Sequence, residues 1–316
     1  MTLHPSPEVS VVMSVYNGAS ALAATLDSVL SQEDCDFEFI VVNDGSADDS
    51  GRILDEWAAR DGRLRVIHQT NTGLTRALIR GCAEARGEFI ARQDCGDASL
   101  PGRLAQQAER LRRDDAYVAV SCHTQFVGPR DELLYQTAIE EARLNEGLRR
   151  GLQGQFRGPS HHGSMMIRRD AYLAAGGYRA AFYFAQDLDL WTRLADSKRF
   201  AVVQKVLYIA RLDPRSISGT QTREQSQLAD LIASATLARR AGGSEDAFLS
   251  AAFGIRPVAR SDLKRRIAGG NYFIGSCLRK TNPSVAATYF RQALDNDPWL
   301  WSARVRWLQS LLAGSF

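Results

Sequence analysis

Apolar segments in the first hundred residues alternate with stretches in which apolar residues recur at helical spacing. The apolar segments are Val9–Val15, Phe37–Val42, Leu64–His68 and Glu88–Arg92. Val9–Val15 is apolar on both faces, as a central strand of a parallel sheet should be, and the other three segments are also predicted to be strands. Between the first two segments, Leu22, Leu26 and Val29 recur three and four residues apart, which predicts an amphipathic helix. Strands alternating with helices of this kind predict βαβ units.

The pattern changes along the second half of the chain. Further strands are expected at Tyr117–Cys122 and Ser164–Ile167, and the stretch Phe200–Arg211 predicts two short strands around Gln204-Lys205. Helices are expected at Pro101–Arg112, Glu140–Leu152, Arg169–Ala175 and Gln186–Asp196. From about Thr220 strand signals disappear, and Ala, Arg, Leu and Gln dominate. We therefore predict an α/β domain over residues 1–219 and an all-helical domain over residues 220–316.

Composition narrows the class of protein. The chain has 316 residues, of which 45% are hydrophobic, and a net charge of +3 from 39 basic and 36 acidic residues. This balance does not predict nucleic-acid binding. The five cysteines are scattered, which is typical of reduced thiols rather than of disulfides or a zinc site. The N-terminus lacks a signal-peptide pattern, and no apolar run approaches about 18 residues, so we expect a cytoplasmic protein.

Polar turns follow three of the predicted strands. Asp44, Asn71 and Asp94 all lie just beyond a strand, in turns that also contain glycine. Ligands of open α/β sheets bind outside the carboxyl ends of the strands. A carboxylate there can hold a divalent cation, which in turn can hold a diphosphate. The alternative is that Asp, Asn and Gly only form the turns.

Five motifs in order resemble the family 2 glycosyltransferases, which have the GT-A fold. They are Val9–Gly18, Val41–Asp48, Asn71–Leu74, Ala91–Pro101 and Gln186–Trp191. The resemblance covers roughly residues 8–218. It implies a Rossmann-like, mostly parallel sheet with helices on both faces, plus an all-helical C-terminal extension.

The implied activity is transfer of a sugar, with inversion, from a nucleotide-diphosphate donor, in particular a UDP-sugar. The acceptor would be a hydroxyl of a glycan or of a lipid-linked glycan in cell-surface polysaccharide synthesis. One alternative is a catalytically silent, glycosyltransferase-like subunit that binds nucleotide or partners. A dinucleotide-dependent oxidoreductase is disfavoured, because no Gly-x-Gly-x-x-Gly follows the first strand.

The resemblance also implies where the nucleotide binds. Asp44 matches the acidic residue that accepts a hydrogen bond from the base, as a uracil imide N–H would donate. For Asp44 an Asx turn is the alternative, and for Tyr16 a buried position with a bonded hydroxyl. The nucleotide contacts implied are Tyr16, Asn17, Asp44, Asn71, Gly73, Arg92 and Asp94.

The expected metal, Mg²⁺ or Mn²⁺, depends on the segment around Asp94. Asp94 matches the first carboxylate of the family's Asp-x-Asp motif, but Gly96 stands at the second position. Asp97 is a candidate replacement, and otherwise it would cap the following helix. Asp213 stands where the family often has a histidine, so we hypothesise that Asp213 compensates for Gly96. Nearby Arg211 and Arg215 are candidate contacts of the diphosphate.

The catalytic base implied by the resemblance is Asp187. Gln186-Asp187 occupies the place of the family's Glu-Asp pair, and an inverting transfer needs a carboxylate to accept the proton of the attacking hydroxyl. The start of a helix favours the charged form of Asp187, although a helix acid without chemistry is the alternative. Trp191 is a candidate wall of the acceptor site or a core residue. His162, in the pair His161-His162, is a candidate sugar contact; the spacing of the pair does not predict metal binding.

The C-terminal residues 271–298 resemble one tetratricopeptide-like helical hairpin. Because about three repeats are needed for a stable solenoid, this hairpin is expected to pack on the catalytic domain or to form a homodimer. The basic run Arg256–Arg266 is a candidate contact with an anionic membrane surface, where a lipid-linked acceptor would reside. This would place the protein peripherally at the inner face of the membrane. The alternative is a solvated helix face.

Overall fold

The structure, a computed structural model, describes residues 6–150, 158–214, 222–257 and 263–313. The chain divides into two compact units. The first comprises residues 1–124, 137–210 and 227–255, and the second comprises residues 125–136, 211–226 and 256–316. The two domains predicted from the sequence, residues 1–219 and 220–316, stay a prediction.

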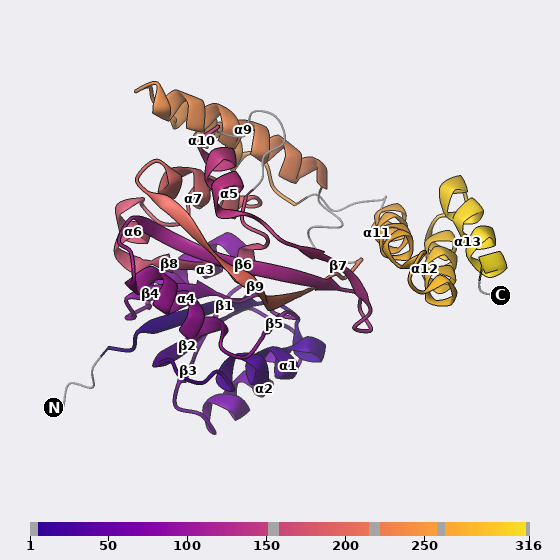
Figure 1. The fold of residues 1–316 in the computed structure, drawn as a ribbon, viewed down its shortest axis with the longest axis horizontal. Helices are drawn as coiled ribbons and strands as arrows, with labels where there is room; N and C mark the ends of the chain where they lie inside the picture. The colour runs from indigo at the N-terminus through magenta and orange to yellow at the C-terminus, as the bar shows by residue number, and fades with distance from the viewer. Residues whose placement is uncertain (1–5, 151–157, 215–221, 258–262, 314–316) are drawn as a thin grey trace. The chain divides into compact units, whose positions relative to one another are not determined.

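One mixed sheet forms the centre of the first unit (Figure 1). Its strands are β1 (Val9–Val15), β2 (Phe37–Asp44), β3 (Leu64–Gln69), β4 (Phe89–Arg92), β5 (Ala98–Ser99), β6 (Tyr117–Val127), β7 (Leu133–Thr137), β8 (Met166–Arg168) and β9 (Arg199–Arg211). Their order is β3-β2-β1-β4-β8-β6-β9-β5, with β7 paired to β6. Strands β1 to β4 pair in parallel, whereas β8 pairs antiparallel with both β4 and β6.

Side chains of β1 alternate between two apolar cores, one on each face of the sheet. Val9, Val11 and Met13 are fully buried in the core that contains α1 (Ala19–Leu30), α2 (Ser50–Ala58) and α4 (Arg103–Arg112). Val12 points to the other core, among residues of α3 (Leu74–Ala83), α5 (Glu141–Arg149), α6 (Arg169–Ala174) and α7 (Gln186–Ala195). This alternation is the period of two of a strand. It confirms the predicted α/β fold with helices on both faces of the sheet.

One strand prediction is wrong. The stretch Phe200–Arg211 forms the single strand β9 rather than two short ones. Gln204 and Lys205 are exposed, and the backbone continues through them. Gln204 side-chain atoms bind the His123 ring at 3.1 Å and the carbonyl of Ile139 at 3.3 Å. Gln204 and Lys205 therefore do not interrupt the strand. A strand continues as long as its backbone is paired, whether or not its side chains are exposed.

Every described element from residue 222 onwards is a helix, which confirms the predicted helical C-terminal segment. The helices are α9 (Thr222–Arg240), α10 (Asp246–Phe253), α11 (Leu263–Leu278), α12 (Pro283–Asn296) and α13 (Trp301–Ala313). In the second unit, α11 and α12 pack through Ile274, Leu278 and Phe290, with Gly275 allowing close approach of the Phe290 ring. Asn282 caps α12 by accepting a hydrogen bond from the N–H of Val285 at 3.3 Å. Among the described residues, no helix has the length and hydropathy needed to cross a bilayer.

Candidate active site

Asp44, at the end of β2, shapes the turn before α3. It is 1% exposed, and its Oδ1 accepts hydrogen bonds from the N–H of Thr72 at 2.9 Å and the amide of Gln69 at 2.7 Å. Its Oδ2 accepts one from the N–H of Gly73 at 2.8 Å. These bonds join Asp44 to a turn 28 residues further on and do not form the Asx turn given as the alternative, while Oδ2 keeps a lone pair for a further donor. The roles of Asp44, Asn71 and Gly73 in nucleotide binding stay predictions.

The loop after β1 is tied to the loop after β2. Asn17 has a φ of 52°, a left-handed conformation that asparagine tolerates. Its N–H donates to the hydroxyl of Ser46 at 3.0 Å, and its side-chain oxygen accepts from the N–H of Ala47 at 2.8 Å. Tyr16 is 56% exposed, so the buried alternative for Tyr16 is wrong. Its ring is free to form a surface for a planar ligand.

Arg92 is buried beneath the candidate metal site rather than exposed to a ligand. It is 1% exposed, and its guanidinium donates to the carbonyls of Val12 at 2.7 Å and Gln93 at 2.6 Å and pairs with Asp94. Burial alone would raise the pKa of the Asp94 carboxyl, but the positive charge of the Arg92 guanidinium opposes this effect and helps to hold that pKa below its usual value. The structure thus gives Arg92 a role in positioning Asp94 and keeping it charged, and its predicted nucleotide contact stays a prediction.

Asp94, Asp97 and His161 form a cluster that could hold a metal ion. One potential ligand atom from each lies within 4.8 Å of the others. His161 Nδ1 is 3.7 Å from Asp97 Oδ2 and 4.0 Å from Asp94 Oδ2. Two carboxylates and an imidazole are a suitable donor set for Mn²⁺, and Mn²⁺ binds nitrogen ligands more strongly than Mg²⁺ does. His161 Nδ1 also accepts a hydrogen bond from the N–H of Gly163 at 3.0 Å, so this nitrogen would exchange that partner for a cation. The chemistry of the donor set fits a divalent cation.

Two glycines give this cluster its geometry. Gly96 has a φ of +99°, which L-residues with a side chain rarely adopt, so an aspartate at this position would be strained. The turn at Gly96 brings Asp97 next to Asp94. The helix-capping alternative for Asp97 is wrong, because α4 begins at Arg103 behind Gly102. On the opposite side, a Cβ on Gly163 would lie 2.0 Å from the hydroxyl of Tyr208, so only glycine permits this approach.

Tyr208 and Arg103 support the cluster of Asp94, Asp97 and His161, and neither residue was identified from the sequence. The Tyr208 hydroxyl donates to Asp97 Oδ2 at 2.9 Å and accepts from the N–H of Asp94 at 3.1 Å. Arg103 is fully buried; it donates to the carbonyls of Arg92 and Gly163, both at 2.7 Å, and lies 4.8 Å from the centroid of the Tyr208 ring. One buried guanidinium therefore joins the end of β4, two residues before Asp94, to the segment that follows His161.

His161, not His162, is the histidine that faces the two carboxylates. His161 has extended backbone angles, so the next side chain points the other way. His162 contacts the hydroxyl of Tyr178 at 2.7 Å, and its ring lies 6.2 Å from that of Trp191. Burial lowers the pKa of His162 to about 3, so this ring is neutral. Trp191 is 6% exposed in an apolar core, and the sugar or acceptor roles of both residues stay predictions.

Asp187 lies in the first turn of α7, as predicted. Its carboxylate accepts a hydrogen bond from the N–H of Leu188 at 2.9 Å. Burial raises the pKa of the Asp187 carboxyl, and this hydrogen bond offsets only part of that effect. The charges of His161 and Asp94 also act on the pKa of Asp187, so the three groups share one electrostatic environment. Its role as general base stays a prediction.

The loop before α7 connects Asp187 to the nucleotide-side turn. The Thr75 hydroxyl at the start of α3 donates to the carbonyl of Phe182 at 2.8 Å, and the Tyr183 ring would be only 2.6 Å from a Cβ on Gly73. Ala185, just before α7, has a φ of +56°. A non-glycine residue in this conformation costs about 1–3 kcal/mol and must be held by its surroundings. The loop that precedes the candidate base is therefore held against the segment that follows the Asp44 turn.

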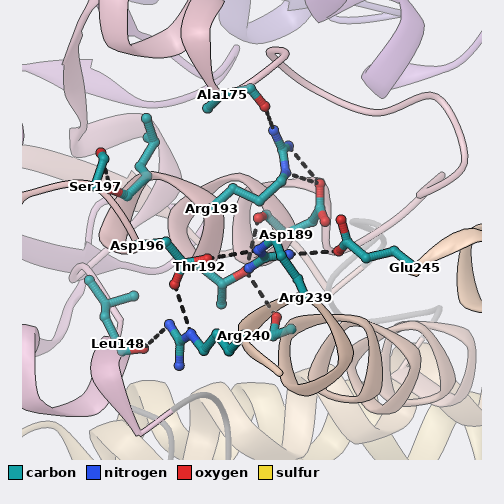
Figure 2. A network of polar contacts seen from close by, with 12 residues as sticks. Leu148, Ala175, Asp189, Thr192, Arg193, Asp196, Ser197, Arg239, Arg240 and Glu245 are labelled. Carbon is teal, nitrogen blue, oxygen red and sulfur yellow. Dashed lines mark hydrogen bonds and ion pairs between the residues drawn. The ribbon is translucent and has the colours of Figure 1, made fainter. Parts of the chain in front are cut away.

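A network of alternating charges holds α7 in place (Figure 2). Asp189 is fully buried, and it pairs with Arg193 at 2.7 Å and with Arg179. Arg179 continues to Glu245 at 3.0 Å, and Glu245 to Arg239 of α9 at 2.6 Å. Figure 2 shows the outer end of this network, where Asp196 pairs with both Arg239 and Arg240, each at 2.7 Å. The helix that carries Asp187 is thereby joined to α9.

The remaining predicted site residues belong to the second unit. Arg211 pairs with Asp131 and donates to the carbonyl of Gly128 at 3.1 Å. Asp213 lines a cavity of about 500 Å³ together with Arg130 and Asn271. Arg215 lies outside the described residues. The diphosphate contacts of Arg211 and Arg215, and the Asp213 ligand with its compensation for Gly96, stay predictions.

Comparison with known proteins agrees with this geometry. Residues 10–174 match the family model described as glycosyl transferase family 2. The Bacillus subtilis protein EpsE, named as a candidate glycosyltransferase, is 32% identical over 217 residues, which are 67% of this chain and 75% of EpsE. The uncharacterized glycosyltransferase EpsJ of the same organism is 30% identical over 67% of this chain and 63% of EpsJ. The chain belongs to the family 2 glycosyltransferases.

Solved structures with the same fold span almost the whole chain. The mannosyltransferase PcManGT from Pyrobaculum calidifontis, in complex with GDP-Man and Mn²⁺, is 19% identical with a TM-score of 0.58, covering 98% of this chain and 86% of its own. S. aureus TarS 1–349 in complex with UDP-GlcNAc is 16% identical with a TM-score of 0.54, covering 96% of this chain and 89% of its own. At such identities the likeness shows the fold, which is GT-A.

Proposed function

We propose that this glycosyltransferase moves a sugar, with inversion, from a UDP-sugar to a hydroxyl of a glycan or lipid-linked glycan in cell-surface polysaccharide synthesis. The observation that carries the proposal is the cluster of Asp94, Asp97 and His161 at the end of β4, in a domain of this family. Two structural neighbours named for GDP-Man with Mn²⁺ and for UDP-GlcNAc support a nucleotide-sugar donor and a divalent cation. The similarity to EpsE, named as a candidate glycosyltransferase, supports sugar transfer.

In this proposal Asp94, Asp97 and His161 hold Mn²⁺ or Mg²⁺. When bound, the cation supplies positive charge that neutralises the leaving diphosphate. Arg92 keeps Asp94 ionised and in position, since its guanidinium is fixed by the carbonyls of Val12 and Gln93. The Tyr208 hydroxyl fixes Asp97 by donating to its Oδ2.

The proposed acceptor chemistry is carried by Asp187. Its carboxylate removes the proton from the acceptor hydroxyl as that hydroxyl attacks the anomeric carbon on the face opposite the leaving nucleotide. A raised pKa makes the carboxylate a stronger base than an exposed aspartate, because burial disfavours its charged form. Asp44 and Tyr16 are proposed to contact the base of the donor nucleotide.

Two measurements test the proposal. Calorimetry with UDP, and with GDP for comparison, is run with and without Mn²⁺, and release of UDP from a panel of UDP-sugars is then followed. We expect Mn²⁺-dependent UDP binding and slow donor hydrolysis, both retained in the exposed control variant Asp27→Asn. Asp187→Asn should retain UDP binding and lose turnover by about 10²–10⁴-fold.

The outcomes separate the candidate functions. Binding of UDP without turnover of any donor would favour the silent glycosyltransferase-like subunit. Preference for GDP would reject the UDP-linked donor. Equal turnover by wild type and Asp187→Asn would reject the assigned base.

A further inference from the structure

One face of helix α13 is buried in the second unit, and the opposite face carries large, exposed apolar side chains. Ala303 is fully buried, in a cluster with Ala268 of α11 and Ala293 of α12. Ser310, seven residues further on and therefore on the same face, is 1% exposed. The opposite face carries large apolar side chains that stay exposed, namely Trp301 (63%), Val305 (50%), Leu308 (53%) and Leu311 (45%). We call these four residues the α13 stripe.

The charge around the α13 stripe is positive. Arg304 lies within the stripe by helical spacing, and its guanidinium is 4.9 Å from the centroid of the Trp301 ring. Residues 301–313 contain Arg304 and Arg306 but neither Asp nor Glu. Residues 256–316 contain ten Lys and Arg against three Asp, whereas the whole chain is nearly balanced at 39 to 36. The excess positive charge of the protein is therefore concentrated in this segment.

These features fit the surface of an anionic lipid bilayer. Helices that lie in the membrane interface combine Trp and Leu on one face with Lys and Arg beside it. Tryptophan favours the level of the lipid headgroups, and Trp299, just before α13, is also 78% exposed. Each Lys or Arg near an anionic leaflet adds attraction.

A second copy of the chain fits the α13 stripe less well. Two-fold packing of the stripe on itself would bring Arg304 of each copy into one interface. Since α13 carries no acidic residue within the described part of the chain, that charge would have no carboxylate on the partner helix. Lipid phosphates supply the missing negative charge.

We propose that α13 docks this protein on an anionic membrane, with the α13 stripe inserted among the lipid headgroups and Arg304 at the level of the phosphates. The proposal goes beyond sugar transfer and does not depend on it. The apolar contact in this proposal is the α13 stripe alone, whereas the basic run Arg256–Arg266, of which residues 258–262 lie outside the described residues, contributes only to the positive charge of the segment.

The full-length protein is tested by flotation with vesicles of phosphatidylcholine alone or with 30% phosphatidylglycerol. We expect flotation only with the anionic vesicles, weakening as salt is raised. The double variant Trp301→Glu/Leu308→Glu should bind at least 10-fold more weakly. Thr288→Glu/Ser284→Glu, which adds the same charge at exposed polar positions of α12, should bind within about 3-fold of wild type. Circular dichroism of both variants checks that the helices remain.

Three results would overturn the proposal. The first is absence of flotation with either kind of vesicle. The second is equal binding by wild type and the stripe variant. The third is a concentration-dependent dimer that the stripe variant converts to monomer, which would make the α13 stripe an interface between copies. UDP binding is measured in parallel, so that failure of membrane docking is distinguished from failure of the proposed transfer activity.

Discussion

Replacing Asp189 by alanine should destabilise the first unit more than any surface charge does. Asp189 is fully buried between Arg193, whose side chain is 7% exposed, and Arg179, whose side chain is 18% exposed. After the change, Arg193 would keep only carbonyl partners, including that of Gly177 at 2.6 Å, and its positive charge would have no carboxylate beside it. Breaking one partner of a buried ion pair costs about 3–5 kcal/mol. We expect a loss of this size in the free energy of unfolding.

The measurement is urea unfolding of the full chain followed by circular dichroism. Glu146→Ala is the matched control, because Glu146 pairs with Arg150 on the surface at 2.5 Å and at least half of each side chain is exposed. Exposed pairs of this kind contribute little, so the control should unfold at the wild-type urea concentration. A loss below about 1 kcal/mol for Asp189→Ala would refute the view that this network is a buried support of α7.

Three further predictions concern the candidate site. His161→Ala should weaken Mn²⁺ binding, measured by calorimetry without nucleotide, by at least about 10-fold, whereas His162→Ala should not; equal losses would reject His161 as a ligand. The kcat/KM of UDP-sugar turnover should fall as pH is lowered through the pKa of Asp187, because only the ionised carboxylate accepts a proton. The inflection should lie above the usual aspartate value of about 4, and an inflection at or below it would contradict the effect of burial. Gly96→Ala should lose about 1–2 kcal/mol of stability, because a residue with a side chain is strained at a φ of +99°. No steric clash adds to this loss, because the atom nearest to the new Cβ is 3.9 Å away. An unchanged urea midpoint would contradict this prediction.

The sequence predicted the parallel half of the sheet better than the antiparallel half. Strands β1, β2 and β4 are mainly apolar and β3 contains three apolar residues, and helical repeats separate all four, so their local pattern is sufficient. The short strand β8 has only three residues, and its place between β4 and β6 depends on contacts distant in the chain. Strand β9 contains two exposed polar residues, which looked like a break because periodicity does not show backbone pairing.

The sequence predicted which motifs carry the candidate site, but it did not predict how individual side chains are oriented or buried. Asp94 and Asp187 follow from their motifs and their places at element ends. His161 was missed because adjacent histidines seemed unsuited to one metal; the extended backbone there means that only one of the pair faces the carboxylates. Arg103 was missed because an arginine in a helix rich in Arg and Gln normally faces solvent, and only tertiary structure shows that it is buried.

The left-handed turn at Gly96 bears on how relatives of this enzyme are found. When a residue between two aspartates has a positive φ, the number of residues between them no longer indicates how far apart their carboxylates lie. A search pattern that demands aspartates two positions apart would pass over chains built like this one. A pattern that accepts three positions, provided that glycine fills the place before the second aspartate, would retrieve them.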